Sequence, residues 1–319
     1  RDSLDISYRN DGSSRFASDY RFGNFYSAGL AWNITEENFL KDNDIINDLK
    51  LRISYGESGN NAVGLNQYQS LFSYGGSYND NGTVTPSSFS NPIISWETAK
   101  LTDVGIDFSI LGGRVSGLVN YYIKDTADLL QSVPLSLTTG HSSYTQNVGT
   151  VRNQGVEIEL DAEVIKSGDF TWSIYSNYAT NDNEILSLAQ DAAGNDINLD
   201  GSYNASRVGR AIGEWFIRTW GGVDSNDGRP YFIVGGDGSP DQPYSNDITY
   251  AQNQALQSFQ GQRMPTYSGG LGTRLSYKGF SVDANLYYSG GNKIFERWPW
   301  TYSQAGGYAT WILHGGADH

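Results

Sequence analysis

The sequence lacks cysteine and is poor in basic residues. Without cysteine, a disulfide scaffold is excluded and a zinc site loses one of its main ligands. Only 21 lysines and arginines stand against 35 aspartates and glutamates, so the formal net charge is −14. This balance argues against a nucleic-acid partner, because little basic surface is available to neutralise phosphates. The same charge is equally compatible with plain solubility.

Long hydrophobic runs are also missing. No segment approaches the roughly 18 consecutive apolar residues that indicate a membrane-spanning helix. The mean hydropathy of −0.47 is typical of a soluble protein. A membrane β-barrel gives a similar average, because its strands alternate lipid-facing and water-facing residues. Hydropathy therefore leaves both a soluble protein and an outer-membrane barrel open.

Enzyme signatures are missing as well. The three histidines, His141, His314 and His319, form no His-Glu-x-x-His motif. The sequence has no Gly-x-Ser-x-Gly elbow, no P-loop and no Gly-x-Gly-x-x-Gly fingerprint. Its acidic pairs are those that 35 carboxylates in a polar chain produce by chance. We therefore predict that the protein is not an enzyme, with no catalytic residue and no cofactor.

One metal-binding motif is partly present. Residues 196–201 (Asp-Ile-Asn-Leu-Asp-Gly) match the first six positions of a calcium-binding loop. The twelfth position of such a loop supplies a bidentate glutamate, but here it is Arg207. A cation would be repelled by that side chain, so a solvated acidic loop is favoured and we predict no metal site.

Aromatic residues and glycine are abundant, and they favour strands and turns respectively. Aromatic residues make up 13% of the chain, which also contains 38 glycines. Apolar and polar residues alternate with a period of two in many segments, which indicates β-strands. This alternation predicts nine strands, over residues 4–8, 26–34, 49–55, 104–110, 115–123, 156–164, 170–178, 271–277 and 280–288.

The most regular alternation lies over residues 156–164. Five apolar side chains alternate there with four acidic ones, so the strand has one apolar and one acidic face. The apolar set is Val156, Ile158, Leu160, Ala162 and Val164, and the acidic set is Glu157, Glu159, Asp161 and Glu163. Many predicted strands are close to the roughly 9–11 residues that a tilted membrane-spanning strand needs.

Tight turns and long polar loops alternate along the chain. Tight turns are predicted at residues 112–113, 166–169 and 278–279, and long loops at residues 10–23, 57–95, 126–153 and 183–266. Counting strands in order places all tight turns at one end of the sheet and all long loops at the other. The exception is residues 35–47, a connection of medium length at the end of the tight turns. Such separation is typical of an outer-membrane barrel, whereas a sandwich mixes both kinds. Residues 215–220 and 231–234 are candidates for an extra strand pair inside the longest loop.

Several motifs occur in the order known from one family. They are Asp-Gly-Ser-Ser-Arg-Phe at 11–16, Leu-Lys-Leu-Arg-Ile-Ser-Tyr-Gly at 49–56, Trp-Glu-Thr at 96–98, Asn-Val-Gly at 147–149, Asn-Gln-Gly at 153–155 and Tyr-Lys-Gly-Phe at 277–280. This ordered set resembles the SusC-like (SusC/RagA) branch of TonB-dependent outer-membrane transporters. Each motif alone is weak, and the specificity lies in their order and spacing. Beyond about Phe295, none of these motifs places the segment with Trp298, Trp300 and Trp311.

The resemblance implies an all-β fold, namely a segment of a large antiparallel up-and-down transmembrane β-barrel with long extracellular loops. Family barrels close with about 22 strands and enclose an N-terminal plug domain. We therefore expect residues 1–319 to be a partial barrel domain, with the plug domain and the remaining barrel strands absent from this chain. Because the chain starts at Arg1 without a signal peptide, we expect it to be the middle of a longer polypeptide.

The resemblance also implies a function, which is active import of a large nutrient across the bacterial outer membrane. In the family a SusD-like surface lipoprotein acts as the lid, TonB supplies the energy, and the substrate is an oligosaccharide or an oligopeptide. Substrate-binding candidates that would face the lumen are Asp107, Glu157, Glu159 and Asp161. One alternative is a SusC-like barrel that serves as a structural or secretion-complex component without import. Another is a soluble all-β carbohydrate-binding or adhesin module.

Overall fold

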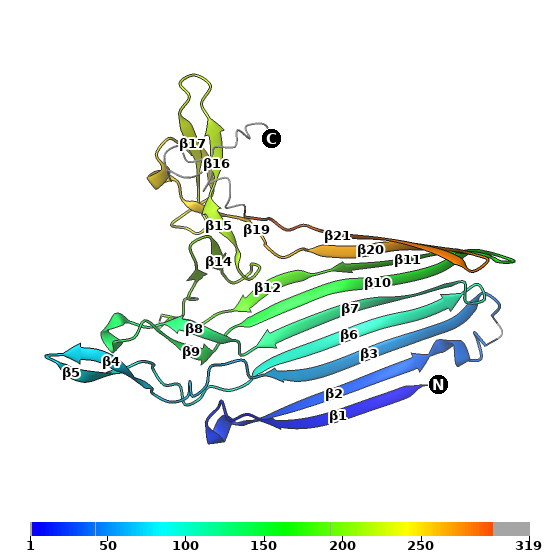
Figure 1. Ribbon diagram of the computed structural model, residues 1–319, viewed down its shortest axis with the longest axis horizontal. Helices are drawn as coiled ribbons and strands as arrows, with labels where there is room; N and C mark the ends of the chain where they lie inside the picture. The colour runs from blue at the N-terminus through cyan, green and yellow to red at the C-terminus, as the bar shows by residue number, and fades with distance from the viewer. Residues whose placement is uncertain (1, 42, 192, 296–319) are drawn as a thin grey trace.

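A large antiparallel sheet dominates the molecule (Figure 1). The computed structural model describes residues 2–41, 43–191 and 193–295. Nine strands follow one another across this sheet, and each is hydrogen-bonded to the next in chain order. They are β1 (Ser3–Gly12), β2 (Phe22–Asn33), β3 (Ile46–Asn60), β6 (Glu97–Ile110), β7 (Val115–Ala127), β10 (Thr150–Ser167), β11 (Phe170–Thr180), β20 (Tyr267–Tyr277) and β21 (Phe280–Gly290). A tenth strand, β12 (Asp182–Ser187), pairs with the first residues of β10.

All nine strands predicted from the alternation are present, and the structure extends most of them toward the long loops. The strand β10 has 18 residues and β3 has 15, against the nine and seven that alternation marks. Most of the added residues are polar or glycine, with Ile46, Val151 and Ile165 as the exceptions, so period-two hydropathy does not reveal these extensions, although backbone pairing continues through them. The up-and-down antiparallel architecture is therefore confirmed, and the sheet stays open across these strands.

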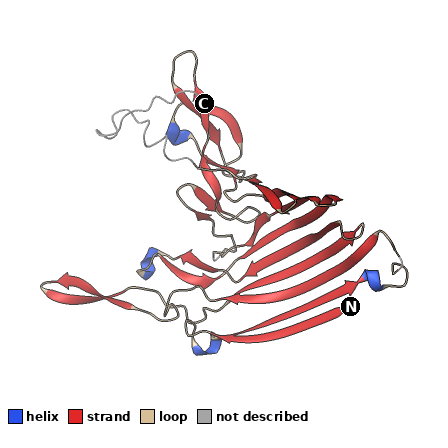
Figure 2. Cartoon of the chain, turned by 45° about the vertical axis from the view of Figure 1, so that its right-hand side comes forward, coloured by secondary structure: helices blue, strands red, loops and turns tan. Residues whose placement is uncertain are grey.

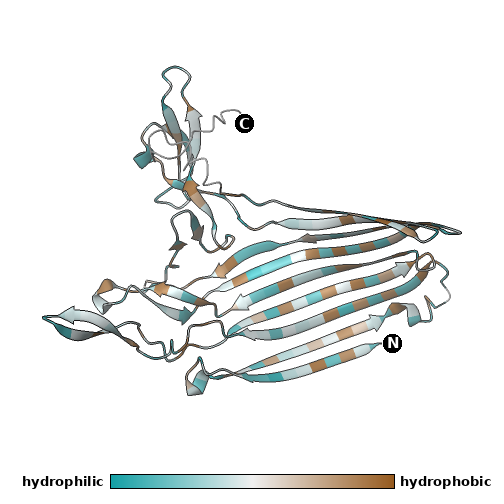
Figure 3. Cartoon of the chain, in the orientation of Figure 1, coloured by the Kyte–Doolittle hydropathy of each residue, from teal (hydrophilic) through white to brown (hydrophobic). Residues whose placement is uncertain are grey.

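The sheet has one apolar and one polar face, which appear as alternating bands along the strands in Figure 3. Residues directly opposite each other in antiparallel strands share a face. Following the register from strand to strand gives an apolar face that includes Ile6, Leu30, Ile53, Ile106, Val119, Leu160, Ile174, Leu271 and Leu286. Many of these side chains are strongly exposed, such as Ile6 at 74%. A surface of this kind needs an apolar surrounding, which a lipid bilayer supplies.

Tyrosines border the apolar face on the side of the long loops. Tyr8 lies opposite Tyr26, but Tyr55 pairs with Ala28, two residues away along β2. The residue of β7 in register with Tyr55 is Ile123, which is two residues from Tyr121. Tyr121 lies opposite Val156 of β10, and Tyr178 of β11 lies opposite Ile158, two residues further along β10. The tyrosines thus form a line that crosses the strands at a slant, as interfacial aromatics do when strands are tilted in a membrane.

One local feature of β10 differs from the predicted alternation. The register shifts between Glu163 and Ile165, so that Ile165 lies opposite Trp172. Val164 is the extra residue of a β-bulge, and Ile165 takes the place on the apolar face that alternation assigns to Val164. The carbonyl of Val164 accepts a hydrogen bond of 2.8 Å from the Arg114 guanidinium. Period-two reading cannot detect such an inserted residue.

The predicted tight turns lie together at one end of the sheet. The turn between β20 and β21 consists of Lys278 and Gly279, with φ of 45° and 85°. Positive φ at both positions is the conformation of a two-residue hairpin whose twist matches that of its strands. Between β6 and β7, the side chain of Asn47 accepts hydrogen bonds of 2.7 and 3.1 Å from the amides of Gly112 and Gly113.

The long loops emerge at the opposite end and carry structure of their own. Two of them form the hairpins β4 (Phe72–Tyr78) with β5 (Asn81–Pro86), and β8 (Leu130–Pro134) with β9 (Ser143–Asn147). The segment between β12 and β20, here called the outer extension, forms two small sheets that rise from the large one (Figure 1). Its strands are β13 (Leu199–Asp200), β14 (Asn204–Ser206), β15 (Glu214–Arg218), β16 (Trp220–Val223), β17 (Pro230–Gly235), β18 (Ser245–Thr249) and β19 (Gln257–Gly261).

The strand pair predicted inside the longest loop is only partly correct. Residues 231–234 lie in β17, but residues 215–218 belong to β15, which pairs with β19, and only Trp220 lies in β16, the partner of β17. These strands belong to the small sheets and add no crossing to the large one. The helices are single 3-10 turns (Figure 2), namely η1 (Ser18–Tyr20), η2 (Ile34–Glu36), η3 (Leu137–Thr139) and η4 (Gln252–Gln254). Within the described segments, no helix is long and apolar enough to cross a membrane. Buried apolar clusters are small and lie beside the long loops, one of them formed by Phe16, Val63 and Ile94.

Candidate functional site

The four predicted substrate-binding residues lie on the polar face of the large sheet. Glu157, Glu159 and Asp161 are alternate residues of β10, and Glu159 lies opposite Leu118 of β7. Leu118 in turn lies opposite Asp107 of β6, which places Asp107 on the same face as the three acidic residues. Their common face is the one opposite to the apolar surface, so in a barrel wall they are available to the interior.

Asp107 differs from the other three acidic residues because its carboxylate is paired with an arginine. The Arg52 guanidinium donates two hydrogen bonds of 2.8 Å to the Asp107 carboxylate and one of 3.1 Å to Asn120. This arrangement ties β3, β6 and β7 together and compensates the charge of Asp107. Gly105 makes it possible, because a Cβ there would lie 1.9 Å from the Asn120 side-chain oxygen.

The three acidic residues of β10 have a different environment. Among the described residues, Glu157, Glu159 and Asp161 take part in no ion pair and no side-chain hydrogen bond. Their cross-strand neighbours on β7 and β11 are uncharged, for example Ser116 and Tyr175 on either side of Asp161. The polar face therefore carries a stripe of three uncompensated carboxylates along β10.

The loops at the outer end are packed against one another at their bases. Asn147, at the end of β9, accepts a hydrogen bond from the Ser95 amide at 2.7 Å and donates one to the Ser95 carbonyl at 2.9 Å. Asn91 donates to the carbonyl of Thr145 at 2.8 Å. These bonds join the loop between β3 and β6 to the loop between β7 and β10. The outer rim is therefore a packed surface of several loops.

Arg207 clamps the two small sheets of the outer extension together. Its guanidinium donates to Asp200 of β13 at 2.8 Å and also to Asp237, which follows β17. The same group lies 4.6 Å from the centre of the Phe216 ring on β15. Burial acts to raise the pKa of Asp237, but hydrogen bonds from Ser239 and Arg207 outweigh it and lower that pKa to about 2.

The partial calcium motif is occupied by this clamp. Asp200 stands at the fifth position of the motif, and its carboxylate is bound by Arg207 at the twelfth. The described residues contain no group of three or more histidines, aspartates or glutamates that could hold a metal ion. Of the three histidines, His141 lies against the Phe89 ring at 5.8 Å, while His314 and His319 lie outside the described residues, as do Trp298, Trp300 and Trp311.

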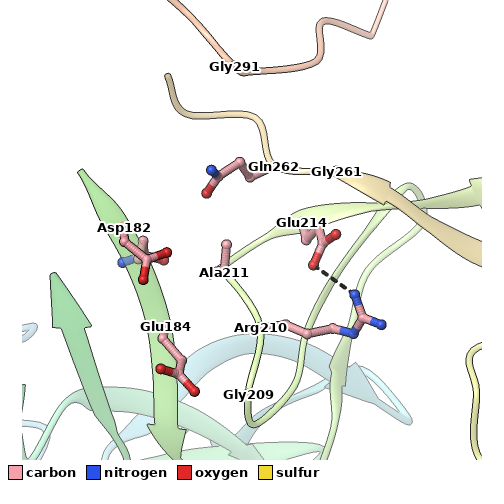
Figure 4. A pocket seen from close by; sticks show the side chains of 10 residues that line it. Asp182, Glu184, Gly209, Arg210, Ala211, Glu214, Gly261, Gln262 and Gly291 are labelled. Carbon is pink, nitrogen blue, oxygen red and sulfur yellow. Dashed lines mark hydrogen bonds and ion pairs between the residues drawn. The ribbon is translucent and has the colours of Figure 1, made fainter. Parts of the chain in front are cut away.

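Two cavities flank the root of the outer extension, where the chain leaves the large sheet after β12 and returns at β20. The first, of about 500 Å³, is acidic and is lined by Asp182, Glu184 and Glu214 among others (Figure 4). Arg210 pairs with Glu214 at 3.3 Å on one side of this cavity. Asp182 and Glu184 stand on the neighbouring strand β12.

The second cavity, here called the mouth cavity, has a volume of about 610 Å³. Residues of the polar sheet face line one side, including Thr126, Asn153 and Ser268, and the returning segment with Arg263 lines another. Sequence reasoning did not identify this site. Its residues are scattered over six segments, and only the general abundance of asparagine near residues 153–183 hinted at an amide cluster.

Comparisons with known proteins agree with this architecture. The TonB dependent receptor-like, beta-barrel family matches residues 1–316, so the match includes the segment with Trp298, Trp300 and Trp311 that the motifs alone did not place. TonB-dependent receptor P3 of Formosa agariphila is 32% identical over 300 residues, which are 88% of this chain and 29% of the relative. TonB-dependent receptor SusC of Bacteroides thetaiotaomicron is 38% identical over 189 residues, which are 56% of this chain and 18% of the relative.

Among solved structures, a chain of the RagAB peptide transporter superposes on 91% of this chain with a TM-score of 0.80 and 28% identity. The same comparison covers 32% of that chain. The RagAB peptide importer in its open-open state gives a TM-score of 0.79. The present chain thus spans about a third or less of the length of these relatives.

Proposed function

We propose, from the premise that this chain belongs to the TonB-dependent receptor-like β-barrel family, that it forms part of an active importer of a large nutrient. The chain is a barrel segment of the bacterial outer membrane, and its relatives are TonB-dependent receptors. The observation that carries the proposal is the two-faced sheet of nine consecutive strands with its structured loops at one end. In this role the large sheet forms part of the barrel wall of the transporter, and the long loops form part of its outer mouth.

The polar face lines the lumen in this proposal, and the apolar face meets lipid. Asp107, Glu157, Glu159 and Asp161 then contribute to the wet interior through which substrate passes. The three free carboxylates of β10 are better placed to meet a passing ligand than Asp107, whose charge Arg52 compensates. A transporter wall needs no catalytic group, and we propose none for this chain.

We further propose that the substrate is an oligosaccharide or an oligopeptide and that a SusD-like surface lipoprotein closes the mouth. The likeness to a chain of the RagAB peptide transporter supports a peptide. The lipoprotein lid is what the resemblance to the SusC-like family implies. Energy would come through TonB. The packed outer rim, from the loop that carries the β4–β5 hairpin to the outer extension, is the surface offered to the lipoprotein.

The rest of the barrel and the plug are proposed to come from polypeptide outside these 319 residues. Among the described residues, β1 and β21 are the edge strands of the large sheet, and open edges in lipid would leave backbone groups without partners, which is not viable. Matched relatives are about three times as long as this chain, which is consistent with further strands.

Uptake measurements test the function. Cells carrying the complete transporter should take up labelled oligosaccharides or oligopeptides, and uptake should stop when TonB is removed. A control strain without the transporter sets the background. If removal of TonB changes nothing, while loss of the barrel abolishes secretion or surface assembly of another protein, the structural alternative replaces import.

A further inference from the structure

The mouth cavity contains a hydrogen-bonded cluster of three asparagines whose orientation is fixed. The backbone amide of Ile212 can only donate, and it bonds to the side-chain oxygen of Asn183 at 2.8 Å. The Asn183 nitrogen therefore points to Asn153 and donates to its side-chain oxygen at 2.9 Å. Asn181 donates to that same oxygen at 3.5 Å while accepting from the Tyr122 hydroxyl at 2.9 Å. Both lone pairs of the Asn153 oxygen are thus engaged.

The remaining capacity of this cluster is mainly that of a donor. The side-chain nitrogen of Asn153 has two N–H groups, and neither has an acceptor among the described residues. Asn181 and Asn183 each use one N–H toward Asn153 and keep the other. Donor groups of this kind match a ligand atom that only accepts, and a carboxylate is such a group.

Arg263 supplies the charge. Four other arginines of the outer extension are engaged: Arg207, Arg210 and Arg229 form ion pairs, and Arg218 donates to a backbone carbonyl at 2.8 Å. The Arg263 side chain forms no ion pair and no hydrogen bond with any described residue, and the Arg263 backbone carbonyl accepts a hydrogen bond of 3.4 Å from the Asn292 side chain. Its guanidinium lies against the backbone at Gly213, where a Cβ would be 3.2 Å from the Arg263 Cζ. Among the described residues, Arg263 is thus a cation without a paired carboxylate, on a segment that lines the mouth cavity.

Acidic residues at the root of the extension form no ion pair with Arg263 and line the other cavity. Asp182, Glu184 and Glu214 line the first cavity, whereas the lining of the mouth cavity contains no acidic side chain. Asn183 is shared by both cavities and forms part of the partition. Apolar side chains complete the mouth cavity, including those of Leu129, Ile212 and Met264.

We propose that the mouth cavity is a subsite for a carboxylate group of the imported ligand. Arg263 binds the carboxylate as a charge-assisted hydrogen-bond donor, Asn153 adds neutral donors, and the apolar wall receives the adjoining part of the ligand. Its volume of about 610 Å³ lies within the range of small-molecule sites, roughly 300–1,000 Å³. This inference rests on the proposed import function and narrows its substrate to a carboxylate-bearing one.

A carboxylate can come from the C-terminus of a peptide or from an acidic sugar, and four probes separate these sources. They are an oligoalanine with a free C-terminus, its C-terminal amide, an oligogalacturonate and its methyl ester. Binding is measured by calorimetry on the full-length transporter in detergent. In one of the two pairs, the probe with the free carboxylate should bind about 10- to 100-fold more tightly than the amide or ester that masks it. This factor is the effect of losing one hydrogen bond to a charged group.

Variants connect that preference to the cavity. Arg263→Gln should weaken the binding of the free acid by a similar factor and leave the binding of the masked probe unchanged. Arg263→Lys should recover part of the lost affinity. Asn153→Asp keeps the acceptor that Asn181 and Asn183 need but places a negative charge beside the ligand, so it should also weaken the acid. Arg229→Gln, at an exposed pair with Asp227, is the matched control and should have no effect. Heat-dependent gel mobility verifies that each variant is folded.

The outcome separates this inference from the function on which it rests. If masked probes bind as well as free acids, if Arg263→Gln binds the acid like the wild type, or if the wild type binds none of the four, the carboxylate subsite is rejected. TonB-dependent uptake of a neutral oligosaccharide or an amidated peptide would then leave the import function in place. Loss of TonB dependence for every substrate would reject the import function itself.

Discussion

At the scale of single residues, the molecule is organised by a few arginines in an acidic chain. Arg52 compensates Asp107 on the polar face, and Arg207 joins the small sheets through Asp200 and Asp237. Arg263 lines the mouth cavity and forms no ion pair with a described residue. None of these roles can be predicted from sequence, because partners such as Arg207 and Asp237 are brought together only by the packing of separate strands.

The Arg207 clamp gives a stability prediction. Arg207→Gln should destabilise the outer extension by about 2 kcal/mol, because it leaves the largely buried Asp237 carboxylate without its cationic partner. Arg207→Lys should recover only part of this, since an ammonium cannot bridge two carboxylates in one plane. Hydrogen exchange of the backbone amides of β15 and β19 would measure the effect. Protection equal to the wild type in Arg207→Gln would contradict the clamp.

The pKa of Asp237 adds a pH dependence. A carboxyl whose pKa falls on folding stabilises the folded state above its unfolded pKa of 3.8, and that contribution is lost as pH falls toward about 2. Exchange protection of the outer extension should therefore hold from neutral pH to about pH 4 and decline below it. In Asp237→Asn this decline should be smaller. An unchanged acid profile in that variant would show that another group controls it.

Leu160 tests which face of the sheet meets lipid. It lies opposite Ser176, inside the apolar band that Tyr178 and Trp172 border on the neighbouring strand β11. Leu160→Arg should cost roughly 2–4 kcal/mol of folding free energy in phospholipid vesicles, because it places a charge in hydrocarbon. Glu159→Arg, on the other face, is the control and should change stability far less. Similar effects of both variants would argue against a two-faced wall.

At the scale of elements, period-two alternation was sufficient to predict the nine strands of the large sheet. These strands are long and keep one face apolar, so the alternation extends over enough residues to identify each strand. The outer extension was predicted only as a loop with one candidate strand pair. Its strands have two to six residues, and β15 pairs with β19 about forty residues away, so local pattern carries little information about them. The bulge in β10 was missed for a similar reason.

The β4–β5 hairpin offers a test of the lipoprotein proposal. Phe72, Tyr74 and Val84 share one of its faces and are exposed, whereas Ser73 and Thr85 lie on the other face and bond to each other. Exposed tyrosine and phenylalanine are typical anchors of protein interfaces. The double change Phe72→Ser and Tyr74→Ser should weaken co-purification of the lipoprotein about tenfold or more. The control Thr85→Ser should not weaken co-purification. If both variants lose co-purification equally, the face with Phe72 and Tyr74 has no specific role in docking.

At the scale of the whole molecule, the chain is an open arc of barrel wall with loops at one end. Such an arc is stable in lipid only if both edges are paired, so the native polypeptide should be longer than these 319 residues. Denaturing electrophoresis of material from outer membranes should show a band two to three times heavier than 35.1 kDa. A single species of 35.1 kDa that extracts as a stable barrel would contradict the need for further strands.

Cysteine labelling along β10 tests the central claim, that this sheet separates lipid from a wet lumen, most directly. The 319 residues contain no cysteine, so single cysteines at positions 157 to 161 introduce the only thiols in this segment. In intact outer membranes, a lipid-confined reagent should label positions 158 and 160, and a small water-soluble reagent should label positions 157, 159 and 161. The reverse pattern, or labelling without alternation, would contradict the account.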